Sequence, residues 1–279
     1  MPPTVSLFGM KIDAVDMSAA VARVQSWIDN HDGRCQYVVT PNTDHAVMFQ
    51  ENPALREVYA TAGMVLADGF PIVAAARLLG KPLPERVTGS DLVPSLFSAY
   101  NARGGEHDSQ APAQRLRVFL LGAADGVAER AAANIEHRWP GVEVVGCYSP
   151  PLGFEKDDAE NAKIIQQINA SAPQLLVIGL GAPKQELWIS RFQHELNVPA
   201  ALCVGATIDF LAGEKRRAPR WMQRAGLEWL HRCASEPRRL VKRYARDAWI
   251  FPGLLWQEAR GKFPRRPRYD YEGPGVRKT

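Results

Sequence analysis

The feature that most constrains the fold is a regular alternation of apolar runs with helical patterns over residues 116–210. The runs "LRVFLLG", "VEVVGCY", "QLLVIGLG" and "ALCVGATIDF" are rich in Val, Leu and Ile. Segments with helical spacing, such as "KQELWISRFQHEL", separate them. Nearly unbroken apolar strands joined by helices are typical of a parallel sheet that is covered on both faces. We therefore predict a Rossmann-like, doubly wound α/β fold.

The first half of the chain repeats the same strand and helix unit. "QYVVTPN" (36–42) predicts a β-branched strand, and the helix that follows it restarts near Pro53. "MVLADGFPIVAAARLLG" (64–80) predicts a short strand, an Asp-Gly turn and a helix opened by Pro71, where the missing N–H costs little. The polar stretch "RGGEHDSQAPAQ", near 101–115, predicts a linker between two α/β subdomains.

Charge divides the chain further. Residues 214–279 hold 18 of the 34 Lys and Arg residues but 7 of the 30 Asp and Glu residues, together with four of the seven Trp residues. We therefore predict an α/β body over 1–212, a basic helical appendage over 213–256 and a flexible tail over 257–279. Basic residues mixed with Trp on helices suit an anionic surface, either lipid headgroups or nucleic acid. A solvated helix whose Trp side chains pack on the body is the alternative.

Several other classes of protein are disfavoured by the sequence. The N-terminal segment lacks the basic region and long apolar stretch of a secretory signal peptide. The most apolar run of the appendage, "AWIFPGLLW" (248–256), is too short to span a bilayer. The four cysteines form no CxxC pair, so neither a zinc site nor a disulfide framework is predicted. We expect a cytoplasmic protein with no metal site and no cofactor.

Ligands of doubly wound sheets bind at the carboxyl ends of the strands, so the loops there are the candidate sites. "GLGAPKQE" joins Gly179 and Gly181 to the start of a helix, whose amides could hold an anion. Lys184 could meet a phosphate, and the amide of Gln185 could hold a uracil or a sugar edge. In the alternative interpretation, the glycines only shape a crossover turn.

Two loops of the first half are further candidates. Asp68, in "VLADGFP", follows a predicted strand; such a carboxylate suits a general base, although a loop Asp is equally a turn-former. In "ERVTGSDL", Arg86 could reach an anion, whereas Thr88 or Ser90 as a helix N-cap would explain the stretch alone. "KDDAEN" opens a helix, where acidic residues favour the dipole, so we exclude it as a metal site. His45 lacks the spacing of a metal ligand.

Six stretches, taken in order, resemble one known family. They are "TPNTDH", "ADGFPIV", "ERVTGSDL", "GLGAPKQE", "GATIDFLAGEKRRAPRWMQRAGLEWLHR" and "EPRRLVKRY", and the resemblance covers residues 5–250. The set resembles the WecG/TagA/CpsF family of bacterial glycosyltransferases, glycosyltransferase family 26. The resemblance implies transfer of a hexose or N-acetylhexosamine from a nucleotide donor, commonly UDP-linked, to a polyprenyl-diphosphate-linked sugar during surface polysaccharide synthesis. It also implies an inverting, metal-independent reaction in residues 1–212, at the inner face of the cytoplasmic membrane.

The resemblance also implies roles for individual residues. Asp68 of the "ADG" motif would be the general base, Thr40 and Asn42 of "TPN" would line the same cleft, and Gln185 would contact the donor. One base suffices for inversion, because it removes the proton of the acceptor hydroxyl while that oxygen attacks the anomeric carbon. The other expected substrate contacts are Gly89, Asp91, Gly179, Gly181, Lys184 and Asp209, of which Asp91 and Asp209 are the alternative bases.

The departing diphosphate needs positive charge, and no Asp-x-Asp-like metal clamp is visible in the sequence. Arginine side chains and helix amides would then supply that charge. The candidates are Arg86 and three arginines of the appendage, Arg217, Arg232 and Arg238. We expect the appendage to fold over the cleft when it meets the membrane, while Trp and other Arg side chains rest among lipid headgroups.

Two other functions compete with this hypothesis. A nucleotide-dependent oxidoreductase would use the same kind of sheet, but no GxGxxG motif follows a predicted strand. A nucleic-acid-binding protein would use the basic appendage, but no RNP, helix-turn-helix or zinc motif accompanies its charge. The sequence leaves the donor sugar open among glucose, N-acetylmannosamine and its uronic acid. It also leaves open whether the chain forms a homo-oligomer.

Overall fold

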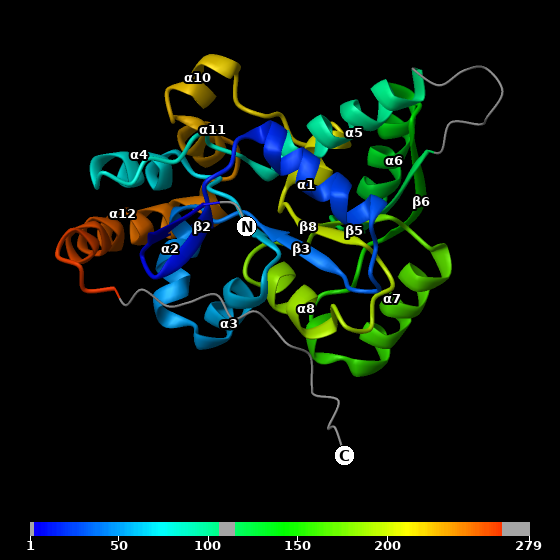
Figure 1. The fold of residues 1–279 in the computed structure, drawn as a ribbon, viewed down its shortest axis with the longest axis horizontal. Coiled ribbons are helices and arrows are strands. Elements are labelled where there is room, and N and C mark those ends of the chain that lie inside the picture. The colour runs from blue at the N-terminus through cyan, green and yellow to red at the C-terminus, as the bar shows by residue number, and fades with distance from the viewer. Residues whose placement is uncertain (1–2, 106–114, 264–279) are drawn as a thin grey trace.

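A six-stranded sheet between two layers of helices forms the body of the protein (Figure 1). The computed structural model describes residues 3–105 and 115–263. Every neighbouring pair of strands in this sheet is parallel. A two-stranded antiparallel hairpin and three C-terminal helices pack at one end of the body. The predicted Rossmann-like α/β class is confirmed.

The sheet has the strand order β4-β3-β8-β7-β5-β6. Its strands are β3 (Gln36–Val39), β4 (Met64–Val65), β5 (Leu116–Gly122), β6 (Val142–Tyr148), β7 (Leu175–Gly179) and β8 (Ala200–Cys203). The sequence predicts parallel sheets in two subdomains, but the strands of both halves form a single sheet. The reason is β8, which pairs with β3 on one edge and with β7 on the other.

Helices cover both faces of the sheet, and each layer buries its own apolar cluster. One layer holds α1 (Met17–Asp29), α5 (Gly89–Gly105), α6 (Val127–Arg138) and α9 (Thr207–Leu211). The other holds α2 (Thr43–Glu51), α3 (Pro53–Thr61), α7 (Asp158–Ser171) and α8 (Lys184–Phe192), with the short 3-10 helix η1 (Phe154–Lys156) before α7. Because both faces are covered, the strands need apolar residues on both sides, which explains their unbroken apolar runs.

Several of these helices begin where capping residues and prolines in the sequence predict a helix start. The side chain of Asn42 caps α2, and Asn52 caps α3, whose first residue is Pro53. Pro71 lies in the first turn of α4 (Phe70–Leu78). Asp157 caps α7 by accepting two backbone N–H groups. The acidic "KDDAEN" stretch therefore serves a helix start, as predicted.

One predicted strand is too long. The sequence predicts a strand through "ALCVGATIDF", but β8 ends at Cys203 and α9 follows. The chain leaves the sheet at Gly205, whose φ is +55°, and the hydroxyl of Thr207 donates to the carbonyl of Val204 at 2.7 Å. Ile208 then packs into the cluster that α5 and α6 share. Tertiary packing thus outweighs the β propensity of this β-branched segment.

Three helices form the C-terminal appendage, and they are docked on the body. They are α10 (Arg220–Arg224), α11 (Glu228–Ser235) and α12 (Pro237–Ala259). α12 packs against α2, and Leu254 is buried in the same cluster as α2 and α3. The carboxylate of Glu258 accepts hydrogen bonds from the Phe8 N–H at 2.7 Å and from Lys81 Nζ at 2.6 Å. Phe8 lies in the N-terminal hairpin, between β1 (Thr4–Leu7) and β2 (Met10–Asp13).

The predicted boundaries shift accordingly. α12 continues past residue 257, where the flexible tail was predicted to begin, because Glu258 is buried against the hairpin. The predicted linker starts inside α5, which reaches Gly105. Residues 106–114 of that linker and 264–279 of the tail lie outside the described residues. None of the described helices is both long and apolar enough to cross a bilayer.

Candidate active site

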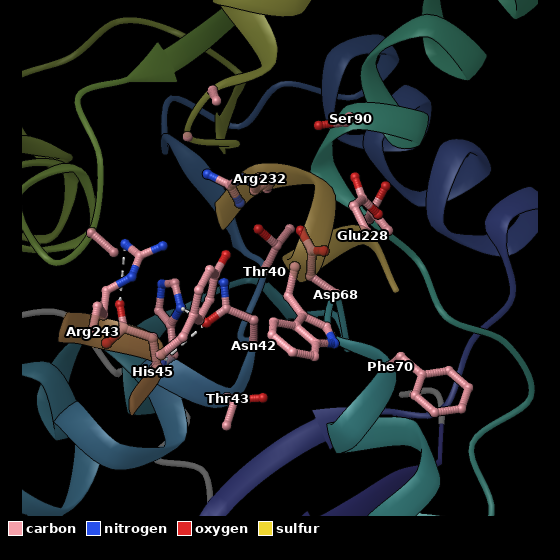
Figure 2. Close-up of a pocket in the computed structure, with 18 of the residues that line it drawn as sticks. Thr40, Asn42, Thr43, His45, Asp68, Phe70, Ser90, Glu228, Arg232 and Arg243 are labelled. Carbon is pink, nitrogen blue, oxygen red and sulfur yellow. Dashed lines mark hydrogen bonds and ion pairs between the residues drawn. The ribbon is translucent and has the colours of Figure 1, made fainter. Parts of the chain in front are cut away.

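A cavity of about 500 Å³ opens at the carboxyl ends of the strands. Residues that follow β3, β4, β7 and β8 form its floor, and residues of α11 and α12 form the opposite wall. Asp68, His45, Thr40 and Asn42 all line the cavity, and in the view of Figure 2 Thr40 and Asn42 appear between Asp68 and His45. The cavity therefore lies where a doubly wound sheet binds its ligands, and the appendage closes part of it.

Asp68 follows β4 and lies at the cavity floor. Its backbone N–H donates to the Pro41 carbonyl at 3.0 Å, and its Oδ2 accepts the backbone N–H of Gly89 at 3.3 Å. Burial and the negative charge of Glu228 raise the pKa of Asp68 to about 6, against the opposing effects of the Gly89 N–H and of nearby arginines. A carboxylate with such a pKa is a competent proton acceptor near neutral pH.

Arginines and one glutamate surround Asp68. Arg86 Nη1 lies 3.4 Å from Glu228 Oε2, and Arg217 Nε lies 3.4 Å from Glu228 Oε1. Both Arg86 and Arg232 are close enough to lower the pKa of Asp68. Among the residues that the structure describes, the guanidinium of Arg232 has no ion-pair or hydrogen-bond partner. Arg232 is therefore available to an anion in the cavity.

Arg217 is held by the first turn of α5. Its guanidinium donates to both carboxylate oxygens of Asp91, one at 2.8 Å, and its Nη2 lies 3.3 Å from the hydroxyl of Thr88. Burial opposes ionisation of Asp91, but the Arg217 contact outweighs burial and lowers the pKa of that carboxyl. Asp91 therefore anchors an arginine of the cavity wall, and it does not line the cavity itself.

A series of polar side chains, hydrogen-bonded one to the next, lies on the floor of the cavity. Asn42 Oδ1 lies 3.0 Å from His45 Nδ1, and His45 Nε2 lies 3.2 Å from Glu186 Oε1. The same Glu186 oxygen accepts from Gln185 Nε2 at 2.7 Å, while Gln185 Oε1 accepts the Gly205 N–H at 3.1 Å. Burial opposes protonation of His45, but Glu186 outweighs it and raises the pKa of the imidazole. This series fixes the start of α8 to the strand-end loops.

The close packing and the backbone conformation of the "GLG" turn explain why glycine occupies its positions. A Cβ at Gly179 would lie 2.9 Å from the Gly205 carbonyl oxygen, and a Cβ at Gly122 would lie 2.6 Å from that of Gly179. Gly181 has a φ of +78°, which disfavours other residues. The turn thus brings three strand-end loops together at the cavity floor.

The structure brings most of the predicted site residues together. Those that line the cavity are Thr40, Asn42, Asp68, Arg86, Gly179, Gly181, Gln185, Asp209, Arg217 and Arg232. Gly89 and Asp91 lie just behind them and bind Asp68 and Arg217. Two do not join the group: Lys184 Nζ pairs with Glu155 at 3.4 Å, and Arg238 is exposed. Neither residue lines the cavity.

Sequence reasoning missed several polar residues of the cavity. His45 and Glu186 are 141 positions apart, so no local spacing announces their contact. Asp44, Arg243 and Asp247 also line the cavity, the last two from α12. Within the described residues, no three His, Cys, Asp or Glu side chains are grouped as metal ligands would be.

Comparison with known proteins shows the family to which the chain belongs. The sequence model of the glycosyl transferase WecG/TagA/CpsF family matches residues 5–265. The chain belongs to this family. The WecG/TagA/CpsF match spans the whole cavity, including the α11 and α12 wall. The resemblance that the sequence motifs indicated is therefore confirmed, and the chain is a member of a glycosyltransferase family.

Individual relatives in this family have known names. The chain is 31% identical over 255 residues to an N-acetylglucosaminyldiphosphoundecaprenol N-acetyl-beta-D-mannosaminyltransferase of Bacillus spizizenii, a match that covers 90% of this chain and 92% of the relative. It is 25% identical over 236 residues to a protein of the same name from Staphylococcus aureus, covering 85% and 86%. The names of these relatives describe sugar transfer to a sugar on a polyprenyl diphosphate.

Proposed function

We propose that the chain is an inverting, metal-independent glycosyltransferase that uses a UDP-sugar donor. It would move a hexose or N-acetylhexosamine to a polyprenyl-diphosphate-linked sugar during synthesis of a bacterial surface polysaccharide. The observation that carries this proposal is Asp68, a cavity carboxylate with a pKa of about 6 beside Arg86 and Arg232. The names of the relatives support N-acetylmannosamine as the first donor sugar to test and N-acetylglucosamine as the first acceptor.

The chemistry needs one base. Asp68 takes the proton of the acceptor hydroxyl while that oxygen forms a bond to the anomeric carbon. The bond from that carbon to the diphosphate oxygen breaks, and its electron pair leaves with the nucleoside diphosphate. Attack from the face opposite the leaving group inverts the anomeric configuration, so no second carboxylate is required.

Positive charge in the cavity stabilises the leaving group. The guanidinium of Arg232 has no partner among the described residues, and Arg86 and Arg217 both pair with Glu228. Guanidinium groups bind phosphate oxygens with two parallel hydrogen bonds, which suits them to a departing diphosphate. We infer that these three arginines do the work that a divalent ion does in metal-dependent transferases.

The donor nucleotide fits the strand-end loops. Gly179 and Gly181 let a ligand approach the backbone closely, while Gln185 and Asp209 offer polar side chains at the same edge. Doubly wound sheets bind nucleotides at this position. This arrangement leaves the α11 and α12 side of the cavity for the sugars and for the acceptor.

The appendage suits a membrane surface. Trp221, Trp249 and Trp256 are exposed on its helices, Trp249 to 88%. The guanidinium of Arg260 lies over the Trp256 ring at 3.7 Å from its centre. Trp and Arg side chains are favoured at the boundary between headgroups and acyl chains. We propose that the protein binds peripherally to the inner face of the cytoplasmic membrane, where its acceptor would lie. A homo-oligomer stays a hypothesis from the sequence.

A transfer assay tests the proposal. The purified full chain is mixed with UDP- and GDP-sugars and a short-chain prenyl-diphosphate N-acetylglucosamine, and the products are followed by mass spectrometry and anomeric NMR. We expect one UDP-sugar to react with inversion, and turnover to survive chelation by EDTA. Retention of configuration would contradict the single-base mechanism. Loss of turnover that a divalent ion restores would contradict metal independence, and no transfer with any pair would contradict the function.

A further inference from the structure

The α12 wall of the cavity holds a carboxylate that the proposed reaction does not use. Asp247 is 2% exposed and lines the cavity. Neither of its carboxylate oxygens has a hydrogen-bond partner among the residues that the structure describes. Buried carboxylates are normally paired or hydrogen-bonded, because burial removes the water that would otherwise solvate them. Asp247 is therefore an acceptor without a donor.

The neighbours of Asp247 belong to α2 and α12. Arg243, one turn earlier on α12, lies with its Nη1 3.5 Å from Asp44 Oδ2, and its Nε has no partner among the described residues. Figure 2 shows Arg243 and His45 together on this side of the cavity. Burial and the negative charge of Asp44 raise the pKa of Asp247 to about 6, while Arg243, Arg246 and His45 oppose that rise.

The unused polar atoms suggest the chemistry of a ligand. Asp247 offers only acceptors, and Arg243 offers an unpaired donor beside it. A group that supplies both hydroxyl or amide hydrogens and an oxygen acceptor would satisfy the two together. Sugars carry such groups on adjacent ring positions, whereas the uracil and the diphosphate of the donor are matched by the strand-end loops and by the arginines near Asp68.

We propose that Asp247, Arg243 and Asp44 form a subsite that binds a neutral pyranose through its hydroxyl or acetamido groups. The subsite rests on the proposed function, and it deepens that function by assigning residues that determine which sugar is accepted. The pyranose belongs either to the donor or to the acceptor, since both carry the same groups. Arg243, Arg246 and His45 are each paired with another carboxylate, those of Asp44, Glu51 and Glu186. The charge of Asp247 is left without an ion-pair partner among the described residues, so the subsite favours a neutral sugar over a uronic acid.

The Asp247→Asn variant tests the subsite in the full chain. The substitution keeps the size of the side chain. It replaces the two acceptor oxygens of the carboxylate with one acceptor oxygen and one NH₂ donor. We expect KM for one sugar substrate to rise about 10- to 100-fold, as the loss of hydrogen bonds to a charged group predicts, with a smaller change in kcat. KM measured separately for donor and acceptor shows which sugar Asp247 binds. Asp32→Asn, a change at an exposed carboxylate beside Arg34, is the matched control.

Deoxy analogues make the test independent of folding. The wild-type enzyme should lose rate with the analogue that lacks the hydroxyl or acetamido group bound by Asp247. The Asp247→Asn variant should lose little further with that analogue, and it should also discriminate less between neutral and uronic sugars than the wild type does.

The outcomes separate the two proposals. A wild-type enzyme that transfers sugar, together with an Asp247→Asn variant that has unchanged KM values and the same response to every deoxy analogue, overturns the subsite alone. A wild-type chain that neither transfers sugar nor binds a sugar nucleotide or the acceptor in calorimetry overturns the subsite and the proposed function together. A preference of the wild type for uronic sugars would also overturn the subsite.

Discussion

The backbone N–H of Gly89 donates to Oδ2 of Asp68 at 3.3 Å, across 21 positions of sequence. A Cβ at Gly89 would lie 2.8 Å from Cγ1 of Val204, closer than side-chain carbons approach one another. Any larger residue would therefore push α5 away from the strand end and lengthen this hydrogen bond. The Gly89 N–H thus holds Oδ2 of Asp68, the proposed base, and leaves Oδ1 to accept a proton from a substrate.

Replacing Asp68 by Asn removes the proposed base and keeps the size of the side chain. We expect kcat to fall by roughly 10² to 10⁴, the usual contribution of general-base assistance. Steady-state transfer rates measure the effect. Asp158→Asn, at an exposed carboxylate that pairs with Arg191, should leave the rate unchanged. Near-normal turnover of Asp68→Asn would move the base to another residue, Asp209 first.

The pH dependence of kcat/KM should report the pKa of Asp68. Since a base acts in its deprotonated form, the rate should rise with pH, reach half its maximum near pH 6 and level off above neutrality. Glu228→Gln removes the negative charge that, after burial, raises this pKa, so the rising limb should move to lower pH. A limb at the same pH in both proteins would show that another group controls it.

Two arginines of the appendage should differ in effect. Arg232 lines the cavity near Asp68, whereas Arg238 is exposed and lies outside the cavity. With a short-chain acceptor in solution, Arg232→Ala should lower kcat/KM about 10- to 100-fold, because a charge-assisted hydrogen bond to the leaving diphosphate is lost. Arg238→Ala should remain close to the wild type. Equal losses in both variants would indicate a general effect of basic charge and no specific role for Arg232.

The buried pair of His45 and Glu186 should make stability depend on pH. The folded protein holds the pKa of His45 above 6.5, because the contact with Glu186 outweighs burial. The contribution of protonated His45 to the free energy of unfolding is therefore complete below pH 6.5, and it is lost as pH rises through the pKa of His45 in the folded protein. Urea unfolding of the wild type and of His45→Gln should differ most at low pH and less at high pH. A difference that is constant with pH would mean that folding does not shift the pKa of His45, and a difference that shrinks at low pH would mean that folding lowers it.

The appendage should unfold together with the body. Leu254 of α12 is buried in the apolar cluster of the body, so Leu254→Ala should lower the free energy of unfolding of the whole chain by about 2–5 kcal/mol. Leu152 is 99% exposed, and Leu152→Ala should change it by less than about 0.5 kcal/mol. A separate early transition in the Leu254→Ala variant, with an unchanged main transition, would show that the appendage folds independently.

Much of the architecture follows from local patterns. The apolar runs of β5 and β7 and the caps at Asn52 and Asp157 are visible in the sequence, because each depends on near neighbours. Asp68 was a candidate because it follows the apolar run "MVLA", but the family resemblance gave it the role of base, which stays a prediction. The "TIDF" segment misled for the same reason, because its β-branched residues carry no signal of the helices that pack on α9.

The features of the fold and of the site that the sequence did not predict depend on contacts between residues far apart in the chain. The pairing of β8 with β3 joins residues more than 160 positions apart, and no local pattern announces that both halves share one sheet. The contacts of Arg217 with Asp91 and of Glu258 with Phe8 join the appendage to the body in the same way. Charge and Trp content revealed the appendage as a segment, but they could not reveal that it already forms a wall of the cavity.

The last long helix of the chain completes the cavity, and this has a consequence for biosynthesis. Strands and loops that carry Asp68 and the "GLG" turn leave the ribosome well before α12, which supplies Arg243 and Asp247. Until α12 has been synthesised and Glu258 reaches the hairpin, the nascent protein lacks the α12 part of the cavity wall. The cavity is then open to water on that side, so we expect a chain that stops before α12 to shield Asp68 less well from solvent than the chain with α12 does.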